Sequence, residues 1–183
     1  MPPNQQVDLE VLRRLSSSNN DKIKVAILGC GMMGQEHISF ISGYSTLQID
    51  FLCDPYKPSL DKALQVMERF NNIAPQPMLL TDESDLLTFA DAIDLLVIAS
   101  PNYLHTDSLT KWGEYDLSIL CEKPVAVSQE QHDALLKLSL EPTFVARIWV
   151  AMEYWYIPTI AKLLHLIPSI GDLRMVTIME SRQ

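Results

Sequence analysis

The chain has 183 residues with a formal net charge of −9 at pH 7, and 48% of its residues are hydrophobic. This composition is that of a globular protein, and the length suffices for one domain, or for one domain and part of a second. The acidic balance and the lack of a Lys/Arg cluster argue against binding to nucleic acid or to an anionic membrane. No apolar run is long enough to span a bilayer.

The spacing of the cysteines indicates the redox state of the protein's cellular compartment. Cys30, Cys53 and Cys121 form no C-x-x-C pair and lie at expected strand ends or in a glycine-rich loop. Such spacing is typical of free thiols in a reducing compartment, and the polar N-terminus has no signal peptide, so we expect a cytoplasmic protein. No set of metal ligands stands out.

Strand and helix patterns alternate after a polar leader at residues 1–21, in which a short helix is predicted at 7–15. Apolar runs predict strands at 23–28, 47–53, 78–80, 92–99, 117–121 and 143–150. Helical spacing predicts helices after residue 34 and at 58–70, 82–89, 103–115 and 128–140, the last with Ser128 and Gln131 as a capping box. The strands are apolar throughout rather than alternating, which favours an α/β fold with a doubly wound parallel sheet.

The stretch KIKVAILGCGMMG contains the spacing G-x-G-x-x-G between a predicted strand and a predicted helix. In that context Gly29 permits a tight turn, Gly31 lets the backbone approach a pyrophosphate, and Gly34 lets the helix pack closely on the strand. The N–H groups of the new helix would then bind the phosphate charge. This pattern predicts a dinucleotide site, whereas an ordinary βα loop is the weaker alternative.

Asp54 ends the second predicted strand, about 20 residues after Gly34. A carboxylate at this place accepts hydrogen bonds from ribose hydroxyls and would repel a 2′-phosphate, which favours NAD over NADP. Lys57 is near enough to weaken that preference. The alternative is that Asp54 and Pro55 only begin a turn.

Two further polar segments follow strands, Ser100–His105 after the fourth and Glu122–Pro124 after the fifth. Ligands of open parallel sheets bind beyond the carboxyl ends of the strands. Lys123 would therefore lie in the cleft, where its ammonium could donate a hydrogen bond to a reacting oxygen. By spacing alone, a solvated lysine is an equal alternative.

From Lys22 to about Arg182 the sequence resembles the Gfo/Idh/MocA family of NAD(P)-dependent oxidoreductases. Four motifs in order carry the resemblance, namely GCGMMG at 29–34, CDP at 53–55, SPNYLH at 100–105 and CEKPVA at 121–126. The resemblance implies a Rossmann-type domain at 22–150 and places Lys123 beside the nicotinamide as the catalytic residue. It also implies the residues that hold the cofactor, which are Gly29, Gly31, Met32, Met33, Gly34, Asp54, Ser100, Asn102, His105, Glu122 and Lys123.

The stretch 151–183 resembles the family's linker helix, expected at 157–166 with Pro158 at its start, and one strand, expected at 171–178. The family's C-terminal sheet domain, which carries the lysine's Asp and His partners, is largely missing by this comparison, so we expect incomplete catalysis. The implied reaction is hydride transfer between a nicotinamide and a carbinol or carbonyl of a sugar, polyol or similar small molecule. The alternatives are a non-catalytic dinucleotide-binding module or a truncated gene product, and a homo-oligomer is possible.

Overall fold

The computed structural model of the chain describes residues 22–70, 75–169, 171–172, 174–175 and 177. These residues fall into two compact units, which divide between Ala151 and Met152. The leader at 1–21 and the helix predicted at 7–15 lie outside the described residues.

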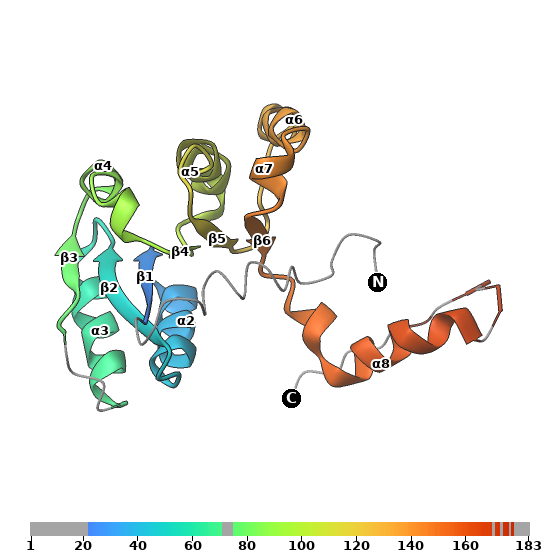
Figure 1. Cartoon of the computed structure of the whole chain (residues 1–183), viewed down its shortest axis with the longest axis horizontal. Coiled ribbons are helices and arrows are strands. Elements are labelled where there is room, and N and C mark those ends of the chain that lie inside the picture. Colours follow the sequence, from blue (N-terminus) through green and yellow to red (C-terminus); the bar gives the residue numbers. More distant parts are fainter. Residues whose placement is uncertain (1–21, 71–74, 170, 173, 176, 178–183) are drawn as a thin grey trace. The chain divides into compact units, whose positions relative to one another are not determined.

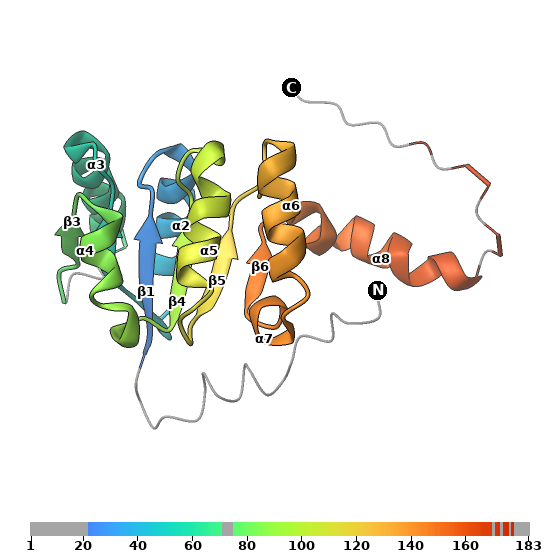
Figure 2. The same ribbon diagram turned by 90° about the horizontal axis from the view of Figure 1, so that it is seen from above.

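The first unit is built on a six-stranded sheet of order β3-β2-β1-β4-β5-β6 in which all pairs are parallel (Figures 1 and 2). Its strands are β1 (Ile23–Leu28), β2 (Leu47–Cys53), β3 (Met78–Leu80), β4 (Leu95–Ile98), β5 (Ser118–Cys121) and β6 (Ile148–Val150). The chain proceeds from β1 toward one edge of the sheet and then returns to place β4 on the other side of β1. The strand order therefore reverses between β1 and β4, and ligands of such sheets bind at this switch point.

Helices cover both faces of the sheet (Figure 1). On one face lie α2 (Met32–Ser42) and α3 (Lys57–Glu68), and on the other lie α4 (Glu83–Leu87), α5 (His105–Trp112) and α6 (Gln129–Leu138). Short 3₁₀ turns, η1 (Ala90–Ala92) and η2 (Asn102–Leu104), precede β4 and α5. The predicted doubly wound α/β fold is confirmed.

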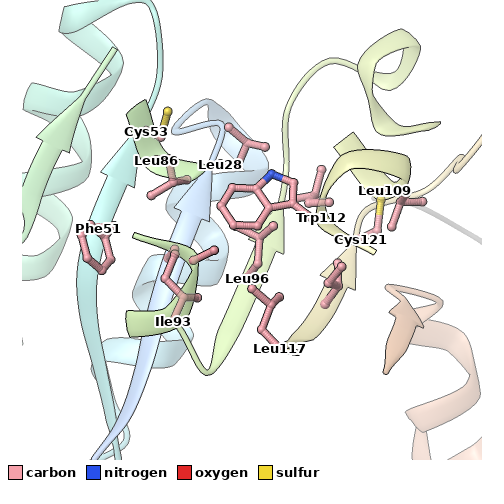
Figure 3. Close-up of a cluster of buried hydrophobic side chains, with 14 residues drawn as sticks. Leu28, Phe51, Cys53, Leu86, Ile93, Leu96, Leu109, Trp112, Leu117 and Cys121 are labelled. Atoms are coloured by element: carbon pink, nitrogen blue, oxygen red, sulfur yellow. The ribbon is translucent and has the colours of Figure 1, made fainter. Parts of the chain in front are cut away.

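The core consists of two hydrophobic clusters, one on each face of the sheet. Successive residues of β1 alternate between them, with Val25 and Ile27 in one cluster and Ala26 and Leu28 in the other. Trp112 of α5 is completely buried in the second cluster, where Figure 3 shows its indole beside Leu28 and Leu96. Both faces of the central strand are covered, which explains its uninterrupted apolar sequence.

The strand predicted at 143–150 is wrong over its first half. Residues Pro142–Val145 form a short helix, α7, and only Ile148–Val150 form β6. Pro142 occupies the first turn, where its fixed φ suits a helix. The Phe144 ring of this helix packs so close to Gly113 that a Cβ there would lie 2.4 Å from a ring carbon.

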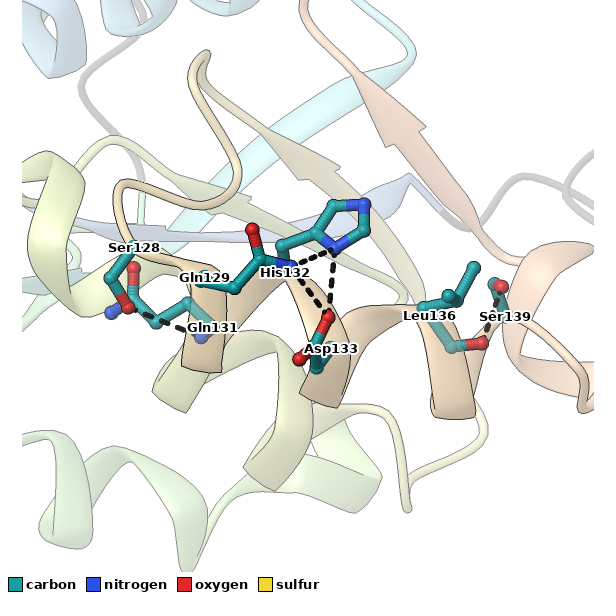
Figure 4. Close-up of polar contacts among 7 residues, drawn as sticks. All are labelled: Ser128, Gln129, Gln131, His132, Asp133, Leu136 and Ser139. Atoms are coloured by element: carbon teal, nitrogen blue, oxygen red, sulfur yellow. Dashed lines mark hydrogen bonds and ion pairs between the residues drawn. The ribbon is translucent and has the colours of Figure 1, made fainter.

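Smaller differences concern element ends. Helix 103–115 is divided into η2 and α5, and the strand predicted from residue 92 begins at Leu95. Ser128 caps α6 by accepting the Gln131 N–H (Figure 4), but the Gln131 side chain accepts the N–H of Val127 rather than that of Ser128. The predicted capping box is therefore only half formed.

The second unit contains the turn η3 (Glu153–Tyr156), helix α8 (Pro158–Leu166) and the turn η4 (Ile167–Ser169). The helix predicted at 157–166 is confirmed, with Pro158 at its first position. In the segment 171–178, the described residues 171–172, 174–175 and 177 form no strand. Among the helices of the described residues, none is long and apolar enough to cross a membrane.

Candidate functional site

Four loops meet at the carboxyl edge of the sheet because their strands are parallel and in register. Leu28, the last residue of β1, pairs with Cys53 on one side and with Ile98 on the other, and Ile98 pairs with Cys121. The loops that follow these strands carry the predicted glycine motif, Asp54, Ser100 and Glu122. The topology thus brings Gly29 and Glu122, which are 93 positions apart, to one edge, as the sequence predicted.

Two glycines of the motif are required by the protein's own packing. Gly29 has a φ of +93°, and a Cβ there would lie 2.5 Å from the backbone of Ala99 and Ser100. A Cβ at Gly34 would lie 2.0 Å from the carbonyl oxygen of Gly29. The first glycine therefore permits the turn against β4, and the last lets α2 start directly against that turn.

Gly31 differs from both. Its φ is −67°, which any residue adopts, and a Cβ there would meet no described atom within 4 Å. Gly31 is also the N-cap of α2 and supplies no side-chain cap for the N–H groups of the first turn, to which Met32 and Met33 belong. The loop therefore leaves open space at the positive end of an eleven-residue helix, an arrangement that fits a phosphate group.

Asp54 is aimed at this loop. Its Oδ2 accepts the backbone N–H of Cys30, and its Oδ1 accepts that of Tyr56, both at 2.8 Å. The first bond joins the carboxylate to the middle of the G-x-G turn, and each oxygen keeps a second lone pair for another donor. Burial, and next the negative charge of Asp54, raise the pKa of the Cys30 thiol to about 12. Cys30 is completely buried and therefore contributes packing rather than a reactive thiolate.

Glu122 and Lys123 occupy the loop after β5. Glu122 is 7% exposed, the Oε1 of its carboxylate lies 2.8 Å from Nε2 of His37, and its Oε2 accepts the Lys123 N–H at 3.3 Å. Lys123 is exposed, and the peptide bond between it and Pro124 is cis. The structure thus places the predicted lysine beside a buried carboxylate that is held from α2.

His37 is the one member of this group that sequence reasoning missed. It lies three residues after Gly34 and four before Ile41, so all three share one face of α2. Gly34 and Ile41 are buried against the sheet. That spacing is a signal that could have identified His37 as a residue facing the loops.

The predicted site residues of the loop after β4 differ in their exposure. Asn102 is exposed at the start of η2, whereas the hydroxyl of Ser100 is buried and finds no hydrogen-bond partner among the described residues. His105 is completely buried, with Nδ1 2.8 Å from the carbonyl oxygen of Pro124 and Nε2 2.8 Å from that of Ser100. His105 therefore lies beneath the loops, between the two segments that the resemblance linked to the cofactor.

The switch point, the glycine turn at an uncapped helix start and the carboxylate at the end of β2 define an α/β protein of the Rossmann type. A family model described as "Oxidoreductase family, NAD-binding Rossmann fold" matches residues 23–143, more than half of the chain. The chain belongs to this family, Gfo/Idh/MocA.

Named relatives support the same family. The chain is 28% identical over 127 residues to 2,7-anhydro-N-acetylneuraminate hydratase of Escherichia coli (strain K12), covering 68% of this chain and 31% of that protein. It is 31% identical over 111 residues to inositol 2-dehydrogenase of Arthrobacter sp. (strain FB24), covering 60% of this chain and 31% of that protein. The chain thus spans about a third of the length of these relatives.

Solved structures share the fold at lower identity. The myo-inositol dehydrogenase of Lactobacillus casei, in complex with NAD(H) and myo-inositol, has a TM-score of 0.68 and 21% identity, covering 81% of this chain and 42% of that one. The scyllo-inositol dehydrogenase of the same species has a TM-score of 0.69 and 18% identity, covering 83% of this chain and 43% of that one.

Proposed function

We propose that this chain binds a nicotinamide dinucleotide at the carboxyl edge of its sheet, and that it prefers NAD to NADP. The observation that carries the proposal is the hydrogen bond from the Cys30 N–H to Asp54 Oδ2. It holds an acidic group beside the open turn at Gly31, so a diphosphate on the turn would have its ribose next to Asp54. A ribose hydroxyl can donate to the remaining lone pairs of the carboxylate, whereas a 2′-phosphate would be repelled.

Two groups of residues would bind the two halves of such a dinucleotide. Gly31, Met32 and Met33 would bind the diphosphate through their N–H groups, and Asp54 would bind the adenosine ribose. Asn102, Glu122 and Lys123 would hold the nicotinamide half, with the Ser100 hydroxyl as a further group that finds no partner in the described part of the chain.

We further propose that the reaction is hydride transfer to or from the carbon of a carbinol or carbonyl in a sugar or polyol. When bound, the nicotinamide supplies or accepts the hydride at C4. Lys123 would donate a hydrogen bond to the reacting oxygen and stabilise the charge that develops on it. The names inositol 2-dehydrogenase and D-glucoside 3-dehydrogenase among the relatives support this substrate class.

Calorimetric titration of the chain with NAD⁺, NADP⁺ and ADP tests the binding proposal. We expect Asp54→Asn to weaken NAD⁺ by about tenfold or more, since it removes a charged acceptor from the ribose. The matched control is Asp94→Asn. Asp94 also accepts a backbone N–H, that of Lys24 at 2.8 Å, but it lies at the amino ends of the strands, away from the proposed site. Equal NAD⁺ affinity of Asp54→Asn and the unaltered chain would refute the ribose contact.

Turnover separates the two functions that the sequence left open. A panel of inositols, aldoses and glucosides with NAD⁺, followed by absorbance of the reduced cofactor, tests the enzyme function, and any activity found should be abolished by Lys123→Ala. A non-catalytic binding module predicts the same NAD⁺ titration with no turnover of any panel member. The expectation that this chain is catalytically incomplete stays a prediction, which the same panel addresses.

A further inference from the structure

The loops after β4 and β5 are tied together by side chains from the start of α5. The His105 ring lies 2.8 Å from the carbonyl oxygens of both Ser100 and Pro124, and a neutral ring donates its single N–H to one of these two oxygens. The next residue, Thr106, donates its hydroxyl to the carbonyl oxygen of Val125, also at 2.8 Å. His105 and Thr106 are 0% and 2% exposed. Two consecutive buried residues thus hold the carbonyls of two consecutive residues in the other loop.

A second tie comes from α6. Gln131 donates from Nε2 to the carbonyl oxygen of Tyr103 at 2.8 Å, and its Oε1 accepts the Val127 N–H at 2.9 Å. The same pair of segments, 100–105 and 124–127, is therefore joined from both sides. Each bond runs to the backbone rather than to a side chain, so it fixes the path of the loop itself.

The segment fixed in this way begins directly after Lys123. With Pro124 and Val125 held, the backbone on the C-terminal side of Lys123 has a defined position, and on the N-terminal side it continues into β5. We propose that His105 and Thr106 are positioning residues, which act through the 124–125 backbone to hold Glu122 and Lys123 against the nicotinamide half of the bound dinucleotide. This inference rests on the proposed function and assigns His105 a place beneath the site rather than contact with the ligand.

The tie lies on the β4–β5 side of the switch point, whereas the glycine turn and Asp54 lie on the β1–β2 side. Loosening it should therefore affect only the part of the ligand that meets Glu122 and Lys123. ADP, which lacks the nicotinamide and its ribose, reports the other part. A loss of NAD⁺ affinity without a loss of ADP affinity therefore measures the effect of the tie on the nicotinamide half.

The leading variant is Thr106→Val, which keeps the branched shape and removes the hydroxyl bonded to Val125. Titration should show NAD⁺ affinity reduced about threefold to tenfold with ADP affinity unchanged, and Thr106→Ser should restore NAD⁺ binding. The matched control is Thr110→Val, because the Thr110 hydroxyl bonds the carbonyl of Thr106 within α5 itself. That variant should leave both affinities unchanged.

A second variant tests the tie from α6 without altering a buried residue. Gln131 is only partly exposed and not in the core, so Gln131→Ala should fold and produce a smaller loss of NAD⁺ affinity with ADP unchanged. Its control is Gln129→Ala, since Gln129 bonds Asp133 within the same helix at 2.8 Å (Figure 4).

Amide hydrogen exchange provides a readout that needs no ligand. Thr106→Val should accelerate exchange at residues 122–127 and leave residues 29–34 unchanged. If NAD⁺ and ADP affinities fall equally, or if neither changes while exchange at 122–127 stays slow, the positioning inference is overturned. If the unaltered chain binds neither ligand, the proposed function itself fails, and the inference fails with it.

Discussion

The side chains of His37 and Glu122 meet across the carboxyl edge of the sheet, with Nε2 of His37 2.8 Å from Oε1 of Glu122. The two residues are 85 positions apart in the sequence and come from α2 and from the loop after β5. The contact spans the switch point between β1 and β4, so it connects the helix that starts at the glycine turn with the loop that carries Lys123. A buried carboxylate needs such a partner, because its desolvation is costly when it has none.

Removal of this imidazole should destabilise the protein. We expect His37→Ala to lower the free energy of unfolding by roughly 1–3 kcal/mol, since it takes a hydrogen-bond partner from a carboxylate that stays buried. Urea denaturation followed by circular dichroism measures the change. His132→Ala is the control, because His132 bonds Asp133 on the exposed face of α6 (Figure 4) and its loss should change stability by less than about 0.5 kcal/mol. Equal effects of the two substitutions would contradict a structural role for the His37–Glu122 contact.

The glycines of the motif should separate folding from binding. Gly31→Ala has room for its methyl group and an ordinary φ, so it should cost only about 1 kcal/mol in stability, because Ala is a poorer N-cap than Gly. The same methyl group would stand where the diphosphate approaches, so NAD⁺ affinity should fall about tenfold or more.

Gly34→Ala, in contrast, should mainly lower the stability of the fold. Its methyl group would lie 2.0 Å from the carbonyl oxygen of Gly29, so the protein should lose several kcal/mol of stability, about 3 or more. Thermal unfolding and NAD⁺ titration of both variants test this pair of predictions. A Gly31→Ala protein that binds NAD⁺ normally would show that the open space at Gly31 is not used by the diphosphate.

The three thiols should be inert in the folded protein. Burial raises the pKa of Cys30, Cys53 and Cys121 from 9.0 to about 12 in each case. A thiol reagent at pH 8 should therefore label none of them until denaturant is added, because the thiolate is the reacting form.

The same shift sets a pH dependence. Between pH 9 and pH 12 the unfolded chain loses thiol protons that the folded chain retains, so the stability from these groups falls as the pH rises through that window. Denaturation midpoints at pH 8 and pH 10 would show the decrease. Rapid labelling of the native protein at pH 8 would count against the burial of all three.

Trp112 should be the most sensitive aromatic position of the core. It is completely buried, and its Nε1 donates to Oε1 of Glu83 at 2.9 Å. Trp112→Ala should cost about 3–5 kcal/mol through the cavity it leaves.

Phe40→Ala serves as the comparison for Trp112. Phe40 lies in α2 and is 72% exposed. Its removal should change stability by less than about 0.5 kcal/mol. Guanidinium denaturation of both variants measures the two losses, and similar losses would show that the hydrophobic cluster in Figure 3 does not depend on the indole.

The sequence by itself determined most elements and the geometry of the glycine turn. Gly29, Gly34 and Asp54 were identified because turn chemistry and the distance between consecutive strands are local properties of the chain. The third strand, Met78–Leu80, and the helix start at Pro158 agree with the structure for the same reason.

Only the tertiary structure decided the rest. It placed His37 against Glu122, buried His105 beneath two loops, and packed Phe144 on Gly113 from the short helix at 142–145. Each of these outcomes depends on which distant strand or helix becomes a neighbour. Strand order sets that choice, whereas the hydrophobic period of any one segment records only which of its faces is buried.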